Sequence, residues 1–243
     1  MKYLLSLIAL STLSMTCIAQ DVYSEQFQTV QKIELLELTL DEHGNEIETI
    51  VESKPLDFFM NQFGKSQGVQ KVNVAGVIMI TKQLIALGKE IYEIVEAGKP
   101  VVNTNSSPIE VLPRDKDGSA ILAMDMTNWR APVVKKYKVQ TKNYLGMSPA
   151  SFEFMLIYSY GGQFEDKGRY ITGAQIKTTR VNVKWGYSLD ANFKLETIMN
   201  QGSSDEPVAG AVLAIDYKIS TVLQEMRESK TFFVNGLGQT TEY

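Results

Sequence analysis

The feature that most constrains the fold is a long alternation of apolar and polar residues from Val181 to Leu195. Every second residue of VNVKWGYSLDANFKL is apolar, and nearly all of the residues between them are polar. Because successive side chains of a strand point to opposite faces, this period of two predicts a half-buried strand. The run is longer than an ordinary strand, so we expect a bend or break within residues 189–192. Trp185 shares the apolar parity, which predicts a core position for its side chain.

Shorter segments of strand character follow one another through the second half of the chain. They are rich in β-branched and aromatic residues, are separated by turn residues, and do not alternate with helical segments. The clearest lie at residues 109–112, 133–144, 152–160, 209–219 and 230–235. We therefore expect a mainly β (α+β) fold, an antiparallel β-sandwich of about seven or eight strands over residues 99–243. Gly161 is expected to end the strand before it, and residues 235–243 to form a frayed tail.

An N-terminal β-hairpin is predicted within an extension at residues 20–53. Leucines alternate over residues 36–40, the strand-favouring residues Ile47, Thr49 and Val51 alternate on the other arm, and the sequence DEHGNE supplies the turn between them. An isolated hairpin is marginally stable in water, so this arm is expected to dock on another part of the protein. Its strand edge could recruit a partner by strand addition, although the role of the hairpin is left open by the sequence.

One long amphipathic helix is predicted at residues 76–98, packed against the sandwich. Val77, Leu84 and Ile91 are spaced seven apart, a second apolar series repeats this spacing, and Gly98 is placed to cap the helix. A short helix at residues 56–63 and a linker are expected before it. Residues 54–98 and the sandwich are expected to form one folding unit over residues 54–243.

The first nineteen residues have the pattern of a signal peptide. Lys2 provides the positive charge, residues 3–13 form a short apolar segment, and Cys17-Ile18-Ala19 matches a cleavage site before Gln20. An uncleaved anchor and a lipoprotein are the alternatives, although Met15-Thr16 does not match the small residues expected before a lipidated cysteine. Cleavage would remove the only cysteine of the chain, and an exported protein without disulfides is typical of Gram-negative bacteria. We expect a periplasmic, outer-surface or secreted location.

The sequence contains few residues that carry catalytic or metal chemistry. The net charge is −4 without a basic run, which argues against nucleic-acid binding. His43 is the only histidine and lies in the hairpin turn, so the common zinc sites cannot be built. A histidine-based triad would have to use His43 at this hairpin tip, far from any concave pocket. Residues 114–118 are expected to form a turn, and Asp115 and Asp117 in it resemble the start of a calcium loop, but the later acidic ligands are missing. No metal or cofactor is expected. A hydrolase that uses two carboxylates or a Ser-Lys pair stays an alternative, because both depend on distance in space.

Aromatic residues near a Gly-Gly pair are the best candidates for a binding site. Loops at the ends of a sandwich carry function, and exposed aromatic side chains there can stack on sugars. The candidate binding residues are Trp129, Arg130, Tyr160, Phe164 and Tyr170.

The sequence VAGVIMITKQLIALGKEI, together with the later IEVLP, resembles the actinoporin-type pore-forming toxins in the rhythm of a helix followed by a strand. The resemblance covers a small part of the chain and includes no tryptophan- and tyrosine-dense lipid-binding loop. It implies a membrane-active protein whose predicted helix enters a bilayer through its apolar face, Ile80, Leu84, Leu87 and Ile91. The first hypothesis is instead an exported, non-catalytic β-sandwich that binds a protein, a glycan or a component of the cell envelope. A membrane surface is an alternative partner, and the oligomeric state is left open.

Overall fold

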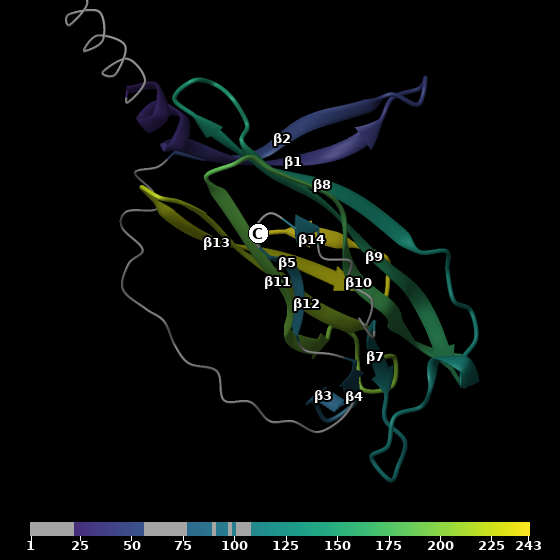
Figure 1. The fold of residues 1–243 in the computed structure, drawn as a ribbon. Helices are drawn as coiled ribbons and strands as arrows, with labels where there is room; N and C mark the ends of the chain where they lie inside the picture. Colours follow the sequence, from purple (N-terminus) through teal and green to yellow (C-terminus); the bar gives the residue numbers. More distant parts are fainter. Residues whose placement is uncertain (1–21, 56–76, 89–90, 97–98, 101–107) are drawn as a thin grey trace, which may run out of the picture.

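The computed structural model describes residues 22–55, 77–88, 91–96, 99–100 and 108–243. In these residues fourteen β-strands form two antiparallel sheets that pack face to face (Figure 1). The predicted mainly β, sandwich-like fold is therefore confirmed, with more strands than the sequence indicated. The described residues also contain one helix at residues 22–28 and a short 3-10 helix, η1 (Ala123–Asp125). Neither of these helices is long and apolar enough to cross a membrane.

The larger sheet has eight strands and the smaller sheet has six. In spatial order the larger sheet contains β2 (Glu46–Pro55), β1 (Val30–Leu40), β8 (Val133–Asn143), β9 (Ala150–Phe164), β10 (Lys167–Val183), β7 (Ile109–Pro113), β4 (Leu84–Leu87) and β3 (Val77–Ile80). The smaller sheet contains β14 (Thr240–Glu242), β13 (Glu225–Asn235), β12 (Ala209–Thr221), β11 (Tyr187–Asn200), β5 (Ile91–Glu96) and β6 (Lys99–Pro100). The turn between β10 and β11 carries the chain from one sheet to the other.

The core between the sheets is rich in aromatic side chains. Tyr137 of β8 stacks on Phe154 of β9 with ring centroids 5.4 Å apart, and on the opposite sheet it meets Phe232 of β13 at 5.0 Å. Phe152 of β9 similarly contacts Tyr217 of β12, with centroids 5.6 Å apart. All five side chains are buried, and burying an apolar side chain of this size contributes roughly 1.5–3 kcal/mol to folding. The aromatic contacts across the interior therefore hold the two sheets together.

The described residues of the predicted helix contain three strands, β3, β4 and β5, where the seven-residue spacing predicts a helix. In β4 the three successive side chains of Leu84, Ile85 and Ala86 are buried, so both faces of this strand are covered. A strand covered on both faces has an unbroken apolar run, and such a run can match helical spacing by coincidence. The β-branched residues of Val77–Ile80 favour a strand over a helix. The predicted long amphipathic helix is therefore wrong.

The membrane face predicted for that helix is not a single face. Ile80 is exposed in β3, Leu84 is fully buried in β4, Leu87 is partly buried, and Ile91 begins a strand of the other sheet. Gly98, the predicted helix cap, lies outside the described residues. The predicted signal peptide and the short helix at residues 56–63 also lie outside them.

The predicted hairpin at residues 32–53 is confirmed as the β1–β2 pair, which projects beyond the rest of the sandwich (Figure 1). Strand β1 also pairs with β8, so the hairpin belongs to the larger sheet. Leu36 and Leu38 are buried on the outer face of β1, where the ion pair from Lys138 to Glu48, at 2.6 Å, passes over them. The aliphatic stems of such long side chains can cover apolar surface while their charges stay in water.

The long alternating run is interrupted at a different place from the one predicted. Strand β10 ends at Val183 and β11 begins at Tyr187, so the break lies at residues 184–186 and not at 189–192. Gly186 has a φ of 84°, a left-handed conformation that suits glycine in a turn. Trp185 is at the tip of this turn and 86% exposed, which corrects its predicted core position.

Candidate binding site

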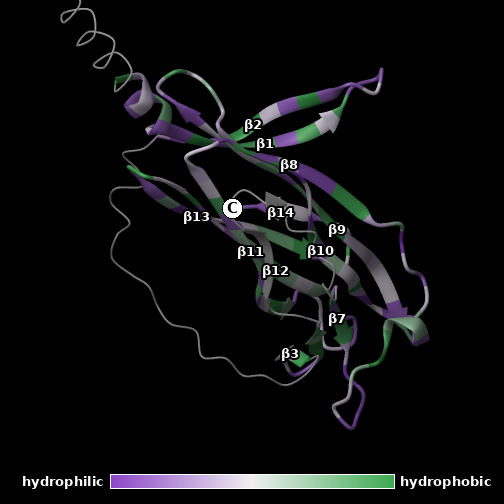
Figure 2. Cartoon of the chain, viewed as in Figure 1, coloured by the Kyte–Doolittle hydropathy of each residue, from purple (hydrophilic) through white to green (hydrophobic). Residues whose placement is uncertain are grey.

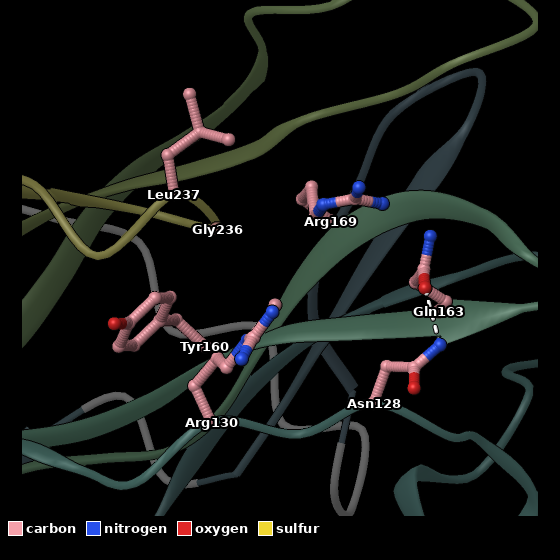
Figure 3. A pocket seen from close by; sticks show the side chains of 8 residues that line it. Asn128, Arg130, Tyr160, Gln163, Arg169, Gly236 and Leu237 are labelled. Atoms are coloured by element: carbon pink, nitrogen blue, oxygen red, sulfur yellow. Dashed lines mark hydrogen bonds between the residues drawn. The ribbon is translucent and has the colours of Figure 1, made fainter.

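A cavity of about 310 Å³ lies at one end of the sandwich (Figure 3). It is formed where the segment that leads into β8, the β9–β10 hairpin and the turn after β13 meet. The residues that line it are Asn128, Arg130, Tyr160, Gly161, Gln163, Arg169, Gly236 and Leu237. In Figure 3 the guanidinium groups of Arg130 and Arg169 lie around the same space, with Tyr160 on one side and Asn128 and Gln163 on the other.

Backbone pairing beyond the start of β8 positions the first two of these side chains. Thr127 and Gln163 exchange two hydrogen bonds of 2.9 Å, and the Arg130 backbone N–H donates to the carbonyl oxygen of Tyr160 at 2.9 Å. Asn128, between them, has a φ of 63°, which turns its side chain out of the strand direction. The segment therefore continues the sheet beside β9 and holds Asn128 and Arg130 along the cavity.

Strand β9 extends beyond the Gly161-Gly162 pair that was predicted to end it. It continues to Phe164 and turns into β10 through Glu165 and Asp166, whose φ values are 51° and 61°. Positive φ at both central residues is the geometry of a two-residue hairpin turn that follows the twist of the strands. This tight turn brings Gln163 of β9 and Arg169 of β10 to the same wall of the cavity.

Two glycines fit the turn after β13 against the cavity wall. A Cβ on Gly236 would lie 2.1 Å from the carbonyl oxygen of Arg169, and a Cβ on Gly238 would lie 2.6 Å from the ring of Tyr160. Only a residue without a side chain allows such close approach of backbone and ring. The chain then continues into β14, so the predicted frayed tail at residues 235–243 is wrong.

The cavity offers positive charge and hydrogen-bond donors. Within the described part of the chain, neither Arg130 nor Arg169 forms an ion pair, and the residues that line the cavity include no carboxylate. The Nη1 atom of Arg169 donates to the carbonyl oxygen of Gly168 at 2.6 Å. The side-chain amide of Asn128 donates to the Gln163 side chain, as the dashed line in Figure 3 shows. Both guanidinium groups therefore keep donors for a ligand.

The structure brings two of the five predicted binding residues, Arg130 and Tyr160, to the cavity. Trp129 is half-buried instead. Its ring covers Gly162 and its Nε1 donates to the Ala123 carbonyl oxygen at 3.0 Å, so it supports the segment that carries Arg130. Phe164 packs partly buried against the core.

Tyr170, the fifth predicted residue, is buried with its ring against Gly168. Burial, reinforced by the negative charge of Glu206, raises the pKa of the Tyr170 hydroxyl to about 12. This side chain is therefore neutral at physiological pH and lies behind the wall of the cavity.

The sequence reasoning missed Asn128, Gln163, Arg169 and Leu237. The signal that could have found Arg169 is the hairpin turn at Glu165-Asp166, but such turns are usually recognised by Asn-Gly or Asp-Gly. Among the described residues no group of three or more histidine, cysteine or acidic side chains could hold a metal ion. His43 lies in the exposed turn of the β1–β2 hairpin.

Comparison of the chain with protein-family models, with curated proteins and with solved structures finds no match. A functional assignment therefore depends on the chemistry of the cavity.

Proposed function

We propose that this protein is an exported, non-catalytic β-sandwich protein that binds an acidic glycan of the cell envelope in the cavity. The observation that carries the proposal is the pair of guanidinium groups, Arg130 and Arg169, which face one space without a carboxylate partner among the described residues. A guanidinium group binds a carboxylate through two parallel hydrogen bonds, so an acidic sugar matches this pair.

The other lining residues suit a sugar ring. Tyr160 presents an aromatic ring that can pack on the apolar face of a sugar. Asn128 and Gln163 carry amide groups, which donate to and accept from sugar hydroxyls. A volume of about 310 Å³ is at the small end of ligand pockets, which fits one or two sugar units. The export signal expected at residues 1–19 is consistent with a ligand outside the cytoplasm.

The alternative functions have less support. The membrane-active hypothesis depends on a helix at residues 76–98, and the described residues of that segment contain strands β3, β4 and β5 and no helix. A hydrolase would need paired carboxylates or a Ser-Lys pair at the ligand, and the residues that line the cavity offer neither.

The proposal is tested by measuring the binding of acidic oligosaccharides and of the same oligosaccharides with their carboxyl groups reduced to alcohols. We expect binding of the acidic forms, weakened about 10- to 100-fold by Arg130→Ala or Arg169→Ala, because a hydrogen bond to a charged group is lost. Arg227→Ala is the matched control, because Arg227 is exposed and paired with Glu225 near the opposite end of β13. Equal binding of the acidic and reduced forms, or no effect of either cavity substitution, would contradict the proposal.

A further inference from the structure

Five exposed apolar side chains gather at the end of the sandwich opposite the cavity. They come from three turns: Tyr144 and Met147 between β8 and β9, Trp185 between β10 and β11, and Val222 and Leu223 between β12 and β13. Trp185 is 86% exposed and Val222 is 77% exposed. We call these five residues the apolar turn patch. Strand β9 runs from this end, at Ala150, to the cavity, where Gln163 lies.

Hydrogen bonds connect the three turns to one another. The Lys184 backbone N–H donates to the carbonyl oxygen of Pro149 at 2.8 Å, which joins the second turn to the first. Tyr187, directly after the second turn, pairs with Thr221 at the start of the third. Figure 1 shows the helix at residues 22–28 at the same end of the molecule, and its Phe27 packs edge-to-face on Tyr187. The turns therefore form one surface.

Each turn is also fixed internally, so its apolar side chains are held in solvent. The buried side chain of Asn143 accepts hydrogen bonds from the backbone N–H groups of Leu145 and Met147. The hydroxyl of Thr221 accepts from the N–H groups of Leu223 and Gln224, and Figure 2 shows this turn ending in hydrophobic residues. A contiguous apolar surface on a folded protein usually marks an interaction site.

The charges beside the patch indicate what covers it. Lys142 precedes Tyr144 by two residues, Lys184 directly precedes Trp185, and neither lysine forms an ion pair within the described residues. Tryptophan and tyrosine flanked by lysine are characteristic of the boundary between a bilayer and water, where the rings enter the headgroup region and the lysines meet anionic headgroups. Self-association through the same face would bring like-charged lysines together, which disfavours a second copy as the occupant.

We infer that the apolar turn patch docks the protein on an anionic lipid bilayer. Trp185 is inserted at the level of the headgroups, Lys142 and Lys184 contact anionic lipid, and the cavity at the opposite end faces away from the membrane. This inference does not depend on the ligand of the cavity, and it involves different residues from the membrane helix predicted at residues 76–98.

The test uses the full chain and vesicles of phosphatidylcholine with or without phosphatidylglycerol. We expect Trp185→Ser combined with Val222→Ser to lower partitioning onto the anionic vesicles about tenfold or more, because two large apolar side chains no longer leave water. Met124→Ser combined with Leu40→Ser is the matched control, since these residues are 84% and 70% exposed outside the patch. The expected N-terminal apolar segment is the same in all variants, so the difference between variants reports on the patch.

Brominated lipids provide an independent readout of the inserted residue. The chain has two tryptophans, Trp129 and Trp185, and Trp129 lies half-buried near the cavity. Bromine in the upper acyl chain should quench the emission of the wild-type protein and leave that of Trp185→Ser unchanged.

Three outcomes would overturn the inference: equal partitioning of the two double variants, quenching that persists without Trp185, or equal binding to vesicles that lack phosphatidylglycerol. Sedimentation of the protein in the absence of lipid tests a fourth outcome that would overturn the inference. Dimerisation that is lost only in the patch variant, without vesicle binding by the wild type, would show that a second copy covers the patch. Urea unfolding of each variant verifies that the fold is retained.

Discussion

Two turns at opposite ends of the sandwich share the same backbone hydrogen bonds and contribute to different surfaces. In each, an asparagine at the end of a strand accepts bonds through Oδ1 from the N–H groups two and four residues later. In each, a glycine three residues after the asparagine has a positive φ, 73° at Gly146 and 83° at Gly238. Asn143 begins the turn of the apolar patch, and Asn235 begins the turn that closes the cavity.

The two turns differ in the residue after the asparagine. Tyr144 extends into solvent, whereas Gly236 is pressed against the backbone of Arg169. The comparison shows that the asparagine and the later glycine fix the course of the backbone. The residue that follows the asparagine is then free either to expose a side chain or to allow a close contact.

Four predictions test this difference between the patch end and the cavity end, in order of decreasing effect.

The largest effect is expected where the two turns differ. Gly236→Ala should lower the free energy of unfolding by about 3 kcal/mol, because the new methyl group would lie 2.1 Å from the Arg169 carbonyl oxygen and force the backbone to move. Tyr144→Ala, at the equivalent position, should change it by less than about 0.5 kcal/mol. Urea unfolding measures both values. Similar losses for the two variants would show that the turns are packed alike.

The second prediction concerns what the turns share. Asn143→Ala and Asn235→Ala should each lower the free energy of unfolding by about 2 kcal/mol, because both side chains are buried and several hydrogen-bond partners are left unpaired. Urea unfolding measures the losses. Binding assays then separate the ends: Asn143→Ala should weaken only vesicle binding, and Asn235→Ala only ligand binding in the cavity. Loss of both activities in either variant would contradict their independence.

The third prediction is that acid loosens the patch end before the cavity end. Burial raises the pKa of Glu34, but hydrogen bonds from Lys32 and Gln140 and the charges of Lys32 and Lys142 outweigh it, so the pKa lies below its ordinary value of 4.5. Gln140 also accepts a hydrogen bond from Ser148, beside the patch turn.

Because the pKa of Glu34 is lower in the folded state than in the unfolded chain, its ionised form stabilises the fold, and this contribution has its full value at any pH above the ordinary pKa. That stability is lost as the pH falls through the lowered folded value. Hydrogen-exchange protection of the Leu145 and Met147 amides, measured relative to Leu237 and Gln239, should therefore decline over that range. Glu34→Gln should abolish the relative decline, and its persistence in this variant would assign the effect to another group.

The smallest effects on stability are expected for one exposed leucine at each end. Leu237→Ser and Leu223→Ser should each change the free energy of unfolding by less than about 0.5 kcal/mol, since both side chains are exposed. Leu237→Ser should weaken cavity binding about threefold and leave vesicle binding intact, and Leu223→Ser should do the reverse, because each variant removes one apolar contact. Titrations with oligosaccharide and with vesicles measure the two kinds of binding for each variant. If Leu237→Ser instead weakened vesicle binding and Leu223→Ser weakened cavity binding, the assignment of the two surfaces would be reversed.

The turns also show how far the sequence could predict the fold. Asp41 and Asp115 begin turns with closely related hydrogen bonds and a glycine three residues later, and both segments were predicted as turns from their Asp and Gly residues. The turns at Asn143 and Asn235 have the same spacing of Asx and Gly, but they were not recognised. In the turn at Asn143, Tyr144 and Leu145 separate the asparagine from Gly146 and hid the pattern. The turn at Asn235 was not recognised because it lies in the segment that was expected to be a frayed tail. Recognising the shared Asx-x-x-Gly spacing would have predicted all four.

Burial explains why other parts could not be predicted. The alternation in β11 and β12 identified half-buried strands correctly, because one face of each meets the core and the other meets water. In β4 both faces are covered, so no alternation exists and a helical spacing could be found instead. Trp185 has the apolar parity of its neighbours, yet Gly186 places it in a turn, and parity carries no information within a turn. The cavity joins segments far apart in the sequence, so its composition follows from the pairing of strands and not from any local motif.

The pairing of strands in the two sheets has a consequence for how fast the protein folds. Strand β1 pairs with β8, and β5 pairs with β11, so each of these ladders joins residues about a hundred positions apart. Contacts between such distant residues require long loops to close before any pairing is gained, and folding is correspondingly slow. A chain that folds slowly remains unfolded for longer after its synthesis. The export predicted from residues 1–19 would require such a delay, because a folded sandwich could not be threaded through a translocation channel.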